Sequence, residues 1–193
     1  MRPPYVVGLD PSLTGTGLAL PPGQPLDVER LRTITSVRTG GTLVDRRRRY
    51  AGIVARVLST LEDHPAFVAT ELLVAVEGYA FASNGRGHAD IIELGWMLRD
   101  RLTGRYGPDA VVEVSPSGLK KYATGSGSSK VSKADMRVAL LKRTGIDERD
   151  ENRVDAEWLR LMALDALGAP VVELPAAHRQ ALDAVAWPTR KAA

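Results

Sequence analysis

The apolar residues of this chain form short runs near its start and helix-spaced sets further on. Continuous or alternating apolar residues predict strands over Tyr5–Leu9, Thr16–Leu20 and Leu31–Val37. Two later runs, Leu72–Val76 ("LLVAV") and Val111–Val114, predict short strands, of which the first is apolar throughout, as in a strand buried on both faces. The pattern therefore begins with three consecutive strands and adds two isolated ones.

Apolar residues spaced by three and four positions predict the helices. Gly145 and Gly168 each follow such a set, as is typical of helix ends. Three strands followed by alternating helices and strands indicate an α/β domain with a mixed five-stranded sheet flanked by helices. The predicted helices cover Leu43–His64, His88–Tyr106, Lys133–Thr144, Val154–Leu167 and a short terminal segment within Leu174–Pro188.

The second of these helices carries a glycine in its interior, Gly95 in "ELGWMLRD". Glycine at such a position costs about 1 kcal/mol relative to alanine, so it predicts close packing against another element. A second subunit is one candidate for that element. We place the neighbouring Trp96 in the core, with a subunit interface as the alternative.

Length and composition narrow the picture further. The 193 residues fit one domain, which we expect over residues 1–168, with a C-terminal extension over residues 169–193 whose short helix packs on the same domain. The absence of cysteine excludes disulfides and thiolate zinc sites. No stretch approaches the roughly 20 apolar residues that a membrane span needs. We expect a soluble, cytoplasmic protein.

Basic residues are clustered, although the net charge is only +3. One cluster lies in the first turns of the predicted helix Leu43–His64, where the helix dipole disfavours cations. It consists of the consecutive residues Arg46, Arg47, Arg48 and Arg49. They fan around the helix, so we expect about two of them to reach a phosphate. A second basic stretch could likewise bind a polyanion such as DNA. It contains Lys120, Lys121, Lys130, Lys133, Arg137, Lys142 and Arg143 against the single acid Asp135. Alternatively, the basic residues of both clusters simply lie on solvated helix faces.

Three acids suggest a site. Asp10 and Glu77 each end a predicted strand, and they meet if the two strands are parallel neighbours. Asp155 lies on the apolar face of its helix, where a carboxylate is unfavourable unless a cation compensates it. Alternatively, each strand ends at a polar residue simply because the sheet ends, and Asp155 is a half-exposed first-turn acid. Asn152, one turn before Asp155, offers an oxygen as a further ligand.

Carboxylate oxygens are ligands of hard cations, so the three acids predict a site for Mg²⁺, with Mn²⁺ able to substitute. Two such ions about 3.5–4 Å apart suit in-line displacement at phosphorus. No nucleotide cofactor is expected.

Four stretches in order along the chain resemble the RuvC-type Holliday junction resolvases of the ribonuclease H-like superfamily, and most closely their phage and actinobacterial relatives. They are "VGLDPSLTGTGLAL", "LLVAVEGYAF", "VEVSPSGLKKYATGSGSSKVSKADM" and "DENRVDAEWLRLMAL". The resemblance implies a ribonuclease H-like fold, a homodimer, two Mg²⁺ per active site, and paired nicks in branched DNA, above all four-way junctions.

The resemblance also implies roles for individual residues. Asp10, Glu77 and Asp155 carry over as catalytic metal ligands, and Lys120, Lys121 and Lys130 as phosphate contacts. The family commonly has an acid or a histidine where this chain has Asn152, and Asp150 is the alternative fourth ligand. Other DNA contacts are predicted at Ser12 and Thr14 in the first turn, at Lys133, and at Tyr79 and Phe81, which flank the place of a stacking aromatic.

Three other functions remain open from the sequence. A nuclease of the same fold could act on flaps, forks, three-way junctions or RNA–DNA hybrids. A phosphotransferase of the sugar-kinase and actin-like class also has an acid and a glycine–threonine turn after its first strand, but it generally needs two such domains. A non-catalytic module would bind junctions without cutting them.

Overall fold

The structure, a computed structural model, describes residues 5–21, 30–38, 40–79 and 86–188, and one five-stranded sheet forms its centre. The order across the sheet is β3-β2-β1-β4-β5. β1 runs parallel to β4 and antiparallel to β2, and β5 is parallel to β4, so the predicted mixed sheet is confirmed. The strands are β1 (Tyr5–Asp10), β2 (Gly15–Ala19), β3 (Leu31–Thr35), β4 (Leu72–Glu77) and β5 (Val111–Val114).

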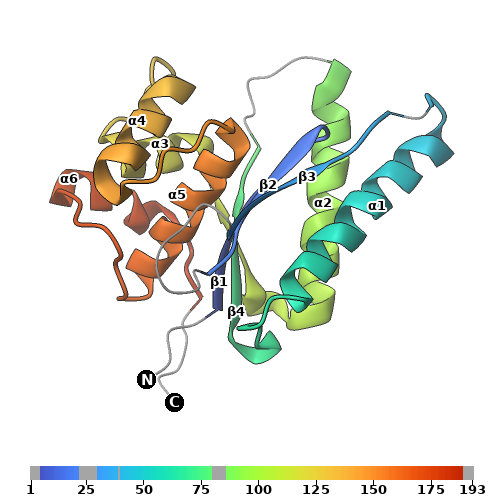
Figure 1. Cartoon of the computed structure of the whole chain (residues 1–193), viewed down its shortest axis with the longest axis horizontal. Coiled ribbons are helices and arrows are strands. Elements are labelled where there is room, and N and C mark those ends of the chain that lie inside the picture. Colours follow the sequence, from blue (N-terminus) through green and yellow to red (C-terminus); the bar gives the residue numbers. More distant parts are fainter. Residues whose placement is uncertain (1–4, 22–29, 39, 80–85, 189–193) are drawn as a thin grey trace.

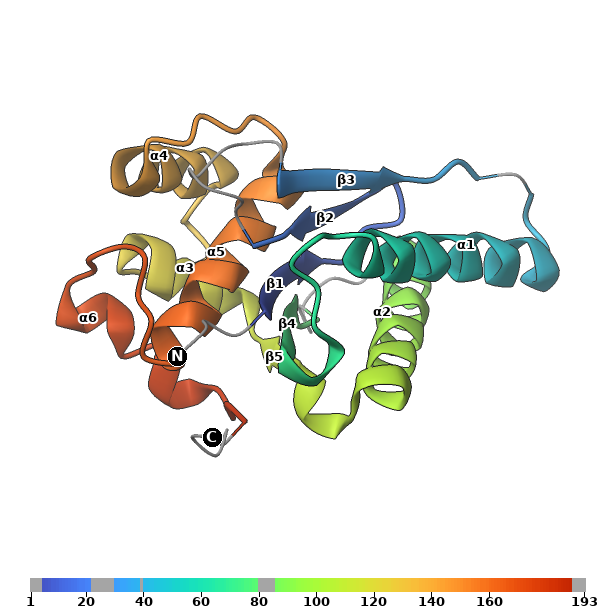
Figure 2. The same ribbon diagram turned by 60° about the horizontal axis from the view of Figure 1, so that its bottom comes forward.

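Helices cover both faces of the sheet, as Figures 1 and 2 show from two directions. α1 and α2 lie on one side, and α5 packs on the other with α3, α4 and α6 outside it. The helices are α1 (Leu43–Glu62), α2 (Arg86–Tyr106), α3 (Pro116–Thr124), α4 (Lys133–Thr144), α5 (Glu151–Ala166) and α6 (Ala176–Arg179), with short 3₁₀ turns at Ala69–Glu71, Pro108–Ala110 and Leu182–Ala184.

Alternation along the central strands assigns their side chains to two cores. In β1, Val6 packs in the core that contains α5, whereas Val7 and Leu9 pack in the core that contains α1 and α2. In β4, Leu73 and Ala75 belong to the α5 side. By the same alternation, Asp10, which follows Leu9, and Glu77, two residues after Ala75, lie on the α5 side.

Two glycines allow α5 to lie directly on the sheet. A Cβ on Gly8 of β1 would overlap the carbonyl oxygen of Ala156, and one on Gly17 of β2 would overlap that of Asn152. The backbone of α5 therefore occupies the space that side chains fill elsewhere in the sheet. Every residue of α5 from Val154 to Asp165 is buried as a result.

A buried group of charges also ties α5 to the sheet. Glu157 of α5 accepts hydrogen bonds from Arg30, which precedes β3, at 2.6 Å and from Arg160 at 3.0 and 3.1 Å. All three side chains are almost fully inaccessible to solvent. Burial alone would raise the pKa of Glu157, but the charge of Arg160 and the hydrogen bonds from Arg30 lower it below its ordinary value.

Several boundaries differ from those predicted. The sequence pattern showed no helix at Pro116–Thr124, yet α3 begins there because Ser115 caps it, proline suits its first turn, and Gly125 ends it. α5 begins three residues earlier than predicted because Asp150 caps it. The predicted terminal helix is instead the four-residue α6 followed by a separate 3₁₀ turn. Its residue His178 bonds to Tyr122 of α3, and Arg179 pairs with Asp165 of α5.

The structure tests two predictions within α2. Trp96 is 64% exposed, so it does not belong to the core. Gly95 is closely packed, as expected, and the atoms nearest to it belong to Tyr79 and Arg99 of the same chain. A side chain at Gly95 would overlap the Tyr79 hydroxyl.

Candidate metal-binding active site

The acids that end β1 and β4 lie side by side. Leu9 pairs with Val76 in the parallel register of the two strands, so the next residues, Asp10 and Glu77, follow at the same edge of the sheet. Both lie on the side that α5 covers, because each is two residues beyond a strand residue on that side. The predicted meeting of these carboxylates at the carboxyl ends of parallel strands is therefore confirmed.

Asp155 of α5 completes the group. One carboxylate oxygen from each of Asp10, Glu77 and Asp155 lies within 4.8 Å of the others. Asp155 is only 3% exposed and Asp10 5%, so Asp155 is a core-facing acid and not a half-exposed one. The close contact of α5 with Gly8 and Gly17 brings Asp155 to this position.

This crowding of carboxylates changes their ionisation. Burial, and then the charges of Glu77 and Asp155, raise the pKa of Asp10 well above its ordinary value. Burial and the charge of Asp155 likewise raise the pKa of Glu77. Burial raises the pKa of Asp155 as well, against the opposing charge of Lys133. A group of acids that resists ionisation in this way is one that a bound cation would stabilise.

The environment of Asp155 tests whether a metal ion fits. Oδ2 pairs with the ammonium group of Lys133, the first residue of α4. Oδ1 is buried and has no hydrogen-bond partner among the residues that the structure describes. A buried carboxylate oxygen without a partner is costly, and a divalent cation among the three acids would satisfy it. The donor set, three carboxylates with no sulfur or histidine, suits Mg²⁺ or Mn²⁺.

The two further ligands considered from the sequence have other partners. Asp150 caps α5: its Oδ1 accepts from the backbone amides of Asn152 and Arg153, and its Oδ2 accepts from Thr33 at 2.6 Å. It therefore lies outside the acidic group. The side-chain amide of Asn152 donates to the Gly15 carbonyl at 2.7 Å, which fixes the start of α5 against β2.

The comparisons with known proteins concern the fold. No protein-family model matches the chain, and no curated protein is significantly similar to it in sequence. Solved structures of Thermus thermophilus RuvC do match. One, in complex with a Holliday junction substrate, is 22% identical over 86% of this chain and 97% of its own, with a TM-score of 0.60. Another is 20% identical with the same coverage and TM-score. The chain has the RuvC fold.

On this RuvC fold, the turn between β1 and β2 is held by its own hydroxyl groups. Ser12 Oγ accepts from the backbone amides of Thr14 and Gly15, and the Thr16 hydroxyl donates to the Ser12 carbonyl at 2.7 Å. Thr14 is exposed at the tip of the turn. The Ser12 side chain thus shapes the turn, and Thr14 is the one of the two that faces solvent.

Arg99, which the sequence analysis did not single out, holds the main chain at Glu77 in place. Arg99 of α2 donates to the Glu77 main-chain carbonyl at 3.0 Å and pairs with Glu113 at 2.9 Å. Its guanidinium also lies 4.8 Å from the Tyr79 ring centroid and donates to the Tyr79 hydroxyl. Tyr79 therefore packs against α2. Phe81, the other aromatic residue predicted as a DNA contact, lies outside the described residues.

The lysines of the second basic stretch face different directions. Lys120 of α3 is close enough to the acidic group for its charge to lower the pKa of Glu77 and of Asp155, although it forms no ion pair within the described part of the chain. Lys121 points toward the C-terminal segment, 3.4 Å from Gln180 Oε1. Lys130 is exposed in the loop between α3 and α4.

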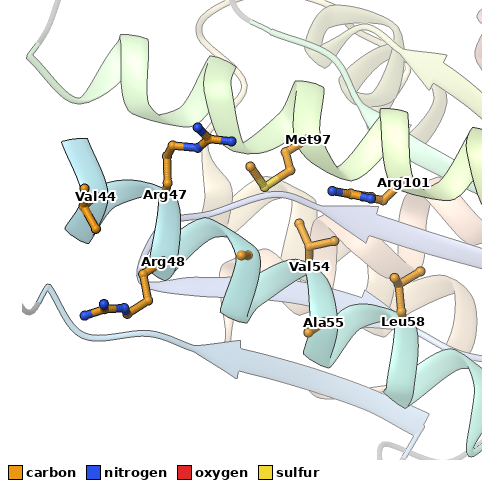
Figure 3. Close-up of a pocket in the computed structure, with 9 residues that line it drawn as sticks. Val44, Arg47, Arg48, Val54, Ala55, Leu58, Met97 and Arg101 are labelled. Atoms are coloured by element: carbon orange, nitrogen blue, oxygen red, sulfur yellow. The ribbon is translucent and has the colours of Figure 1, made fainter.

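The arginine run divides into two structural and two exposed residues. Arg46 pairs with Asp90 of α2 at 3.0 Å, and Arg49 donates to Ser36 and to the Leu13 carbonyl. Arg47 and Arg48 are exposed, and neither forms an ion pair with any residue that the structure describes. Both line a groove of about 630 Å³ beside α1 and α2, together with Arg101 and several apolar side chains. Figure 3 shows these residues.

None of the described helices combines the length and the apolar composition needed to cross a bilayer.

Proposed function

We propose that this protein is a divalent-metal-dependent endonuclease that resolves four-way DNA junctions in the cytoplasm. The observation that carries the proposal is the convergence of Asp10, Glu77 and Asp155 from two strands and a helix onto one point, with Asp155 Oδ1 left without a partner in the described part of the chain. The RuvC fold supports the choice of substrate, since one matching structure holds a Holliday junction.

The reaction is the addition of water across a phosphodiester bond. The hydroxyl joins phosphorus, the P–O3′ bond breaks, and the 3′ oxygen takes up a proton, leaving 5′-phosphate and 3′-hydroxyl ends. Two Mg²⁺ ions, when bound, supply a lowered pKa for the attacking water and charge stabilisation for the leaving oxygen. Asp10, Glu77 and Asp155 would hold them.

The chain's own residues orient this site. Gly8 and Gly17 set the distance from α5 to the sheet, and therefore the place of Asp155. Arg99 fixes the main chain at Glu77 through its hydrogen bond to the carbonyl. Because these supports are packed on helices and strands, the three carboxylates are held in position before substrate arrives, which lowers the reorganisation needed during reaction.

Basic side chains on either side of the acids would receive the DNA backbone. Besides Lys133, which contacts Asp155, Lys120 is close enough to the acids for its charge to act on Asp155. Lys130 is exposed beyond α3, and Arg47 and Arg48 are exposed on the first turns of α1. Binding through several phosphates is steeply dependent on salt, so we expect affinity for branched DNA to fall sharply between low and physiological salt.

The decisive experiment is cleavage of a synthetic four-way junction with Mg²⁺ by the wild type and by Asp10→Asn and Glu77→Gln. We expect both variants to fall at least a hundredfold in rate. Asp109→Asn is the matched control. Asp109 is an exposed acid two residues before β5 begins, at the end of that strand remote from Glu77. Cutting by Asp10→Asn at the wild-type rate would exclude the proposed site.

The same assay, run side by side on flap, fork, three-way and RNA–DNA substrates, tests the alternative substrates. A preference for one of these over the four-way junction would retain the nuclease and change its biological target. ATP hydrolysis without any DNA cleavage would favour a phosphotransferase instead. Tight junction binding by a wild type that never cuts would favour a non-catalytic module.

We further propose that the active form is a homodimer, because paired nicks at opposite strands need two active sites. The mass of the protein in solution tests this directly. A monomer at micromolar concentration, in the presence and absence of junction, would contradict symmetric cleavage.

A further inference from the structure

Lys133 stands at a position that its own helix does not favour. It is the first residue of α4, where the helix dipole is unfavourable to a cation. A capping box between Ser132 and Asp135 fixes this first turn, so the direction in which Lys133 leaves the helix is also fixed. Its ammonium group reaches α5 and pairs with Asp155 Oδ2, while the side chain as a whole stays 44% exposed. The contact with Asp155, rather than helix electrostatics, accounts for the position.

The charges around this ammonium group are those of the acidic site. Asp10 faces it from β1, Glu77 from β4 and Asp155 from α5, and each of the three attracts it. Lys120 of α3 adds a second positive charge at longer range. Metal binding requires all three carboxylates to be ionised, and the lysine that contacts Asp155 then balances one of their three negative charges. The two that remain are the charge that a single divalent cation balances.

We propose that Lys133 is an internal counterion that occupies one of the two cation positions of the acidic site, so that the DNA-free protein binds only one divalent ion tightly. A lysine suits this role because its ammonium group is a compact point charge on a flexible stem, able to enter and leave an oxygen-lined site. The inference deepens the proposed function and rests on the same three acids being a metal site.

The test is a calorimetric titration of Mn²⁺ into the full chain without DNA. Lys133→Met removes the charge and keeps much of the length of the stem, and Lys130→Met is the matched control, because Lys130 is exposed in the same basic stretch. We expect one tightly bound Mn²⁺ for the wild type and for Lys130→Met. For Lys133→Met we expect either a second bound ion or at least tenfold tighter binding of the first.

Thermal unfolding gives a second readout that does not depend on activity. In chelator, Lys133→Met should unfold at a lower temperature than the wild type, because three crowded carboxylates are left without their counterion. In saturating Mn²⁺ this difference should shrink or reverse, since a bound ion replaces the missing charge. A variant of equal stability in both conditions would overturn the inference.

The titration also separates the counterion role of Lys133 from the metal site itself. If Glu77→Gln abolishes Mn²⁺ binding while Lys133→Met binds one ion with wild-type affinity, the metal site stands and the counterion role of Lys133 is wrong. If Glu77→Gln binds Mn²⁺ like the wild type, the acids are not the metal site and the proposed function falls with the inference.

Discussion

Gly8 of β1 lies directly beneath Ala156 of α5, so closely that any side chain at Gly8 would overlap the Ala156 carbonyl oxygen. Such a side chain would also stand 2.9 Å from the backbone nitrogen of Arg160. Because both neighbours are backbone atoms of a buried helix, they cannot turn away as a flexible side chain could. Ala156 is also the residue next to Asp155, so this contact sets the depth of the third acid.

Gly8→Ala should therefore push α5 off the sheet. We expect a decrease of about 1–3 kcal/mol in the free energy of unfolding, as for other overpacked cores, together with reduced junction cleavage. Gly52→Ala is the matched control, because Gly52 is exposed in α1 and a Cβ there meets nothing within 4 Å. That control should gain up to about 1 kcal/mol through helix propensity. Urea unfolding of both variants measures the difference, and equal stability would show that α5 adapts to the extra methyl group.

Asp10→Asn should stabilise the metal-free protein at neutral pH. Burial and the charges of Glu77 and Asp155 raise the pKa of Asp10 above its ordinary 3.8, so the folded state holds a proton that the unfolded state releases. The stability of the wild type in chelator should therefore fall as pH rises from about 4 through the raised pKa. The variant lacks this group and should show a flatter profile.

Melting temperatures between about pH 4 and pH 8, measured with EDTA and then with Mn²⁺, test this prediction. Asp10→Asn should melt above the wild type at about pH 7 in EDTA, and Mn²⁺ should raise the melting temperature of the wild type alone. A variant that melts below the wild type under those conditions would show that Asp10 is stabilised by interactions other than those with a cation.

Glu157→Gln should destabilise the fold strongly. Removing this one negative charge leaves the guanidinium groups of Arg30 and Arg160 buried without the carboxylate that they share, which typically costs about 3–5 kcal/mol. The comparison is Glu62→Gln, which breaks the partly exposed pair with Arg105 and should cost less than about 1 kcal/mol. Chemical denaturation of the two variants measures both. A decrease below about 1 kcal/mol for Glu157→Gln would mean that water reaches the buried charges.

The double variant Arg47→Gln/Arg48→Gln should weaken junction binding without unfolding the protein. Both side chains are exposed, so each can reach a phosphate and neither holds the fold. The slope of log K against log salt should become shallower by about 0.9 for each phosphate that the variant no longer neutralises. Arg56→Gln is the control, because Arg56 is exposed further along α1. An unchanged slope would place the DNA away from the start of α1.

Much of the acidic site follows from the sequence, because short-range rules govern its parts. Asp10 and Glu77 could be predicted because each ends a run of strand residues, and parallel strands share an edge. Asp155 could be predicted because its spacing from Trp158 and Leu159 marks it as facing the core. The roles of these acids in catalysis remain predictions.

Other features depend on how distant elements meet, which no local pattern encodes. The contact of Lys133 with Asp155 depends on the angle between α4 and α5, and the position of Arg99 behind Glu77 depends on how α2 packs on β4. The exposure of Trp96 also depends on how α2 packs. Although Trp96 follows the buried residues Leu94 and Gly95, it lies on the face of α2 that is turned away from the sheet. The start of α3, by contrast, was signalled by Ser115-Pro116 and could have been found.

The sheet order has a consequence for how the site forms. β1 and β4 are central strands, each paired with a neighbouring strand on both sides. Asp155 lies instead on α5, a helix that follows all five strands in the sequence and packs on the face of the sheet. Opening α5 away from the sheet would leave two acids in place and remove the third. Metal affinity therefore reports on the docking of α5, and a bound ion should slow hydrogen exchange in α5 more than in β1 or β4.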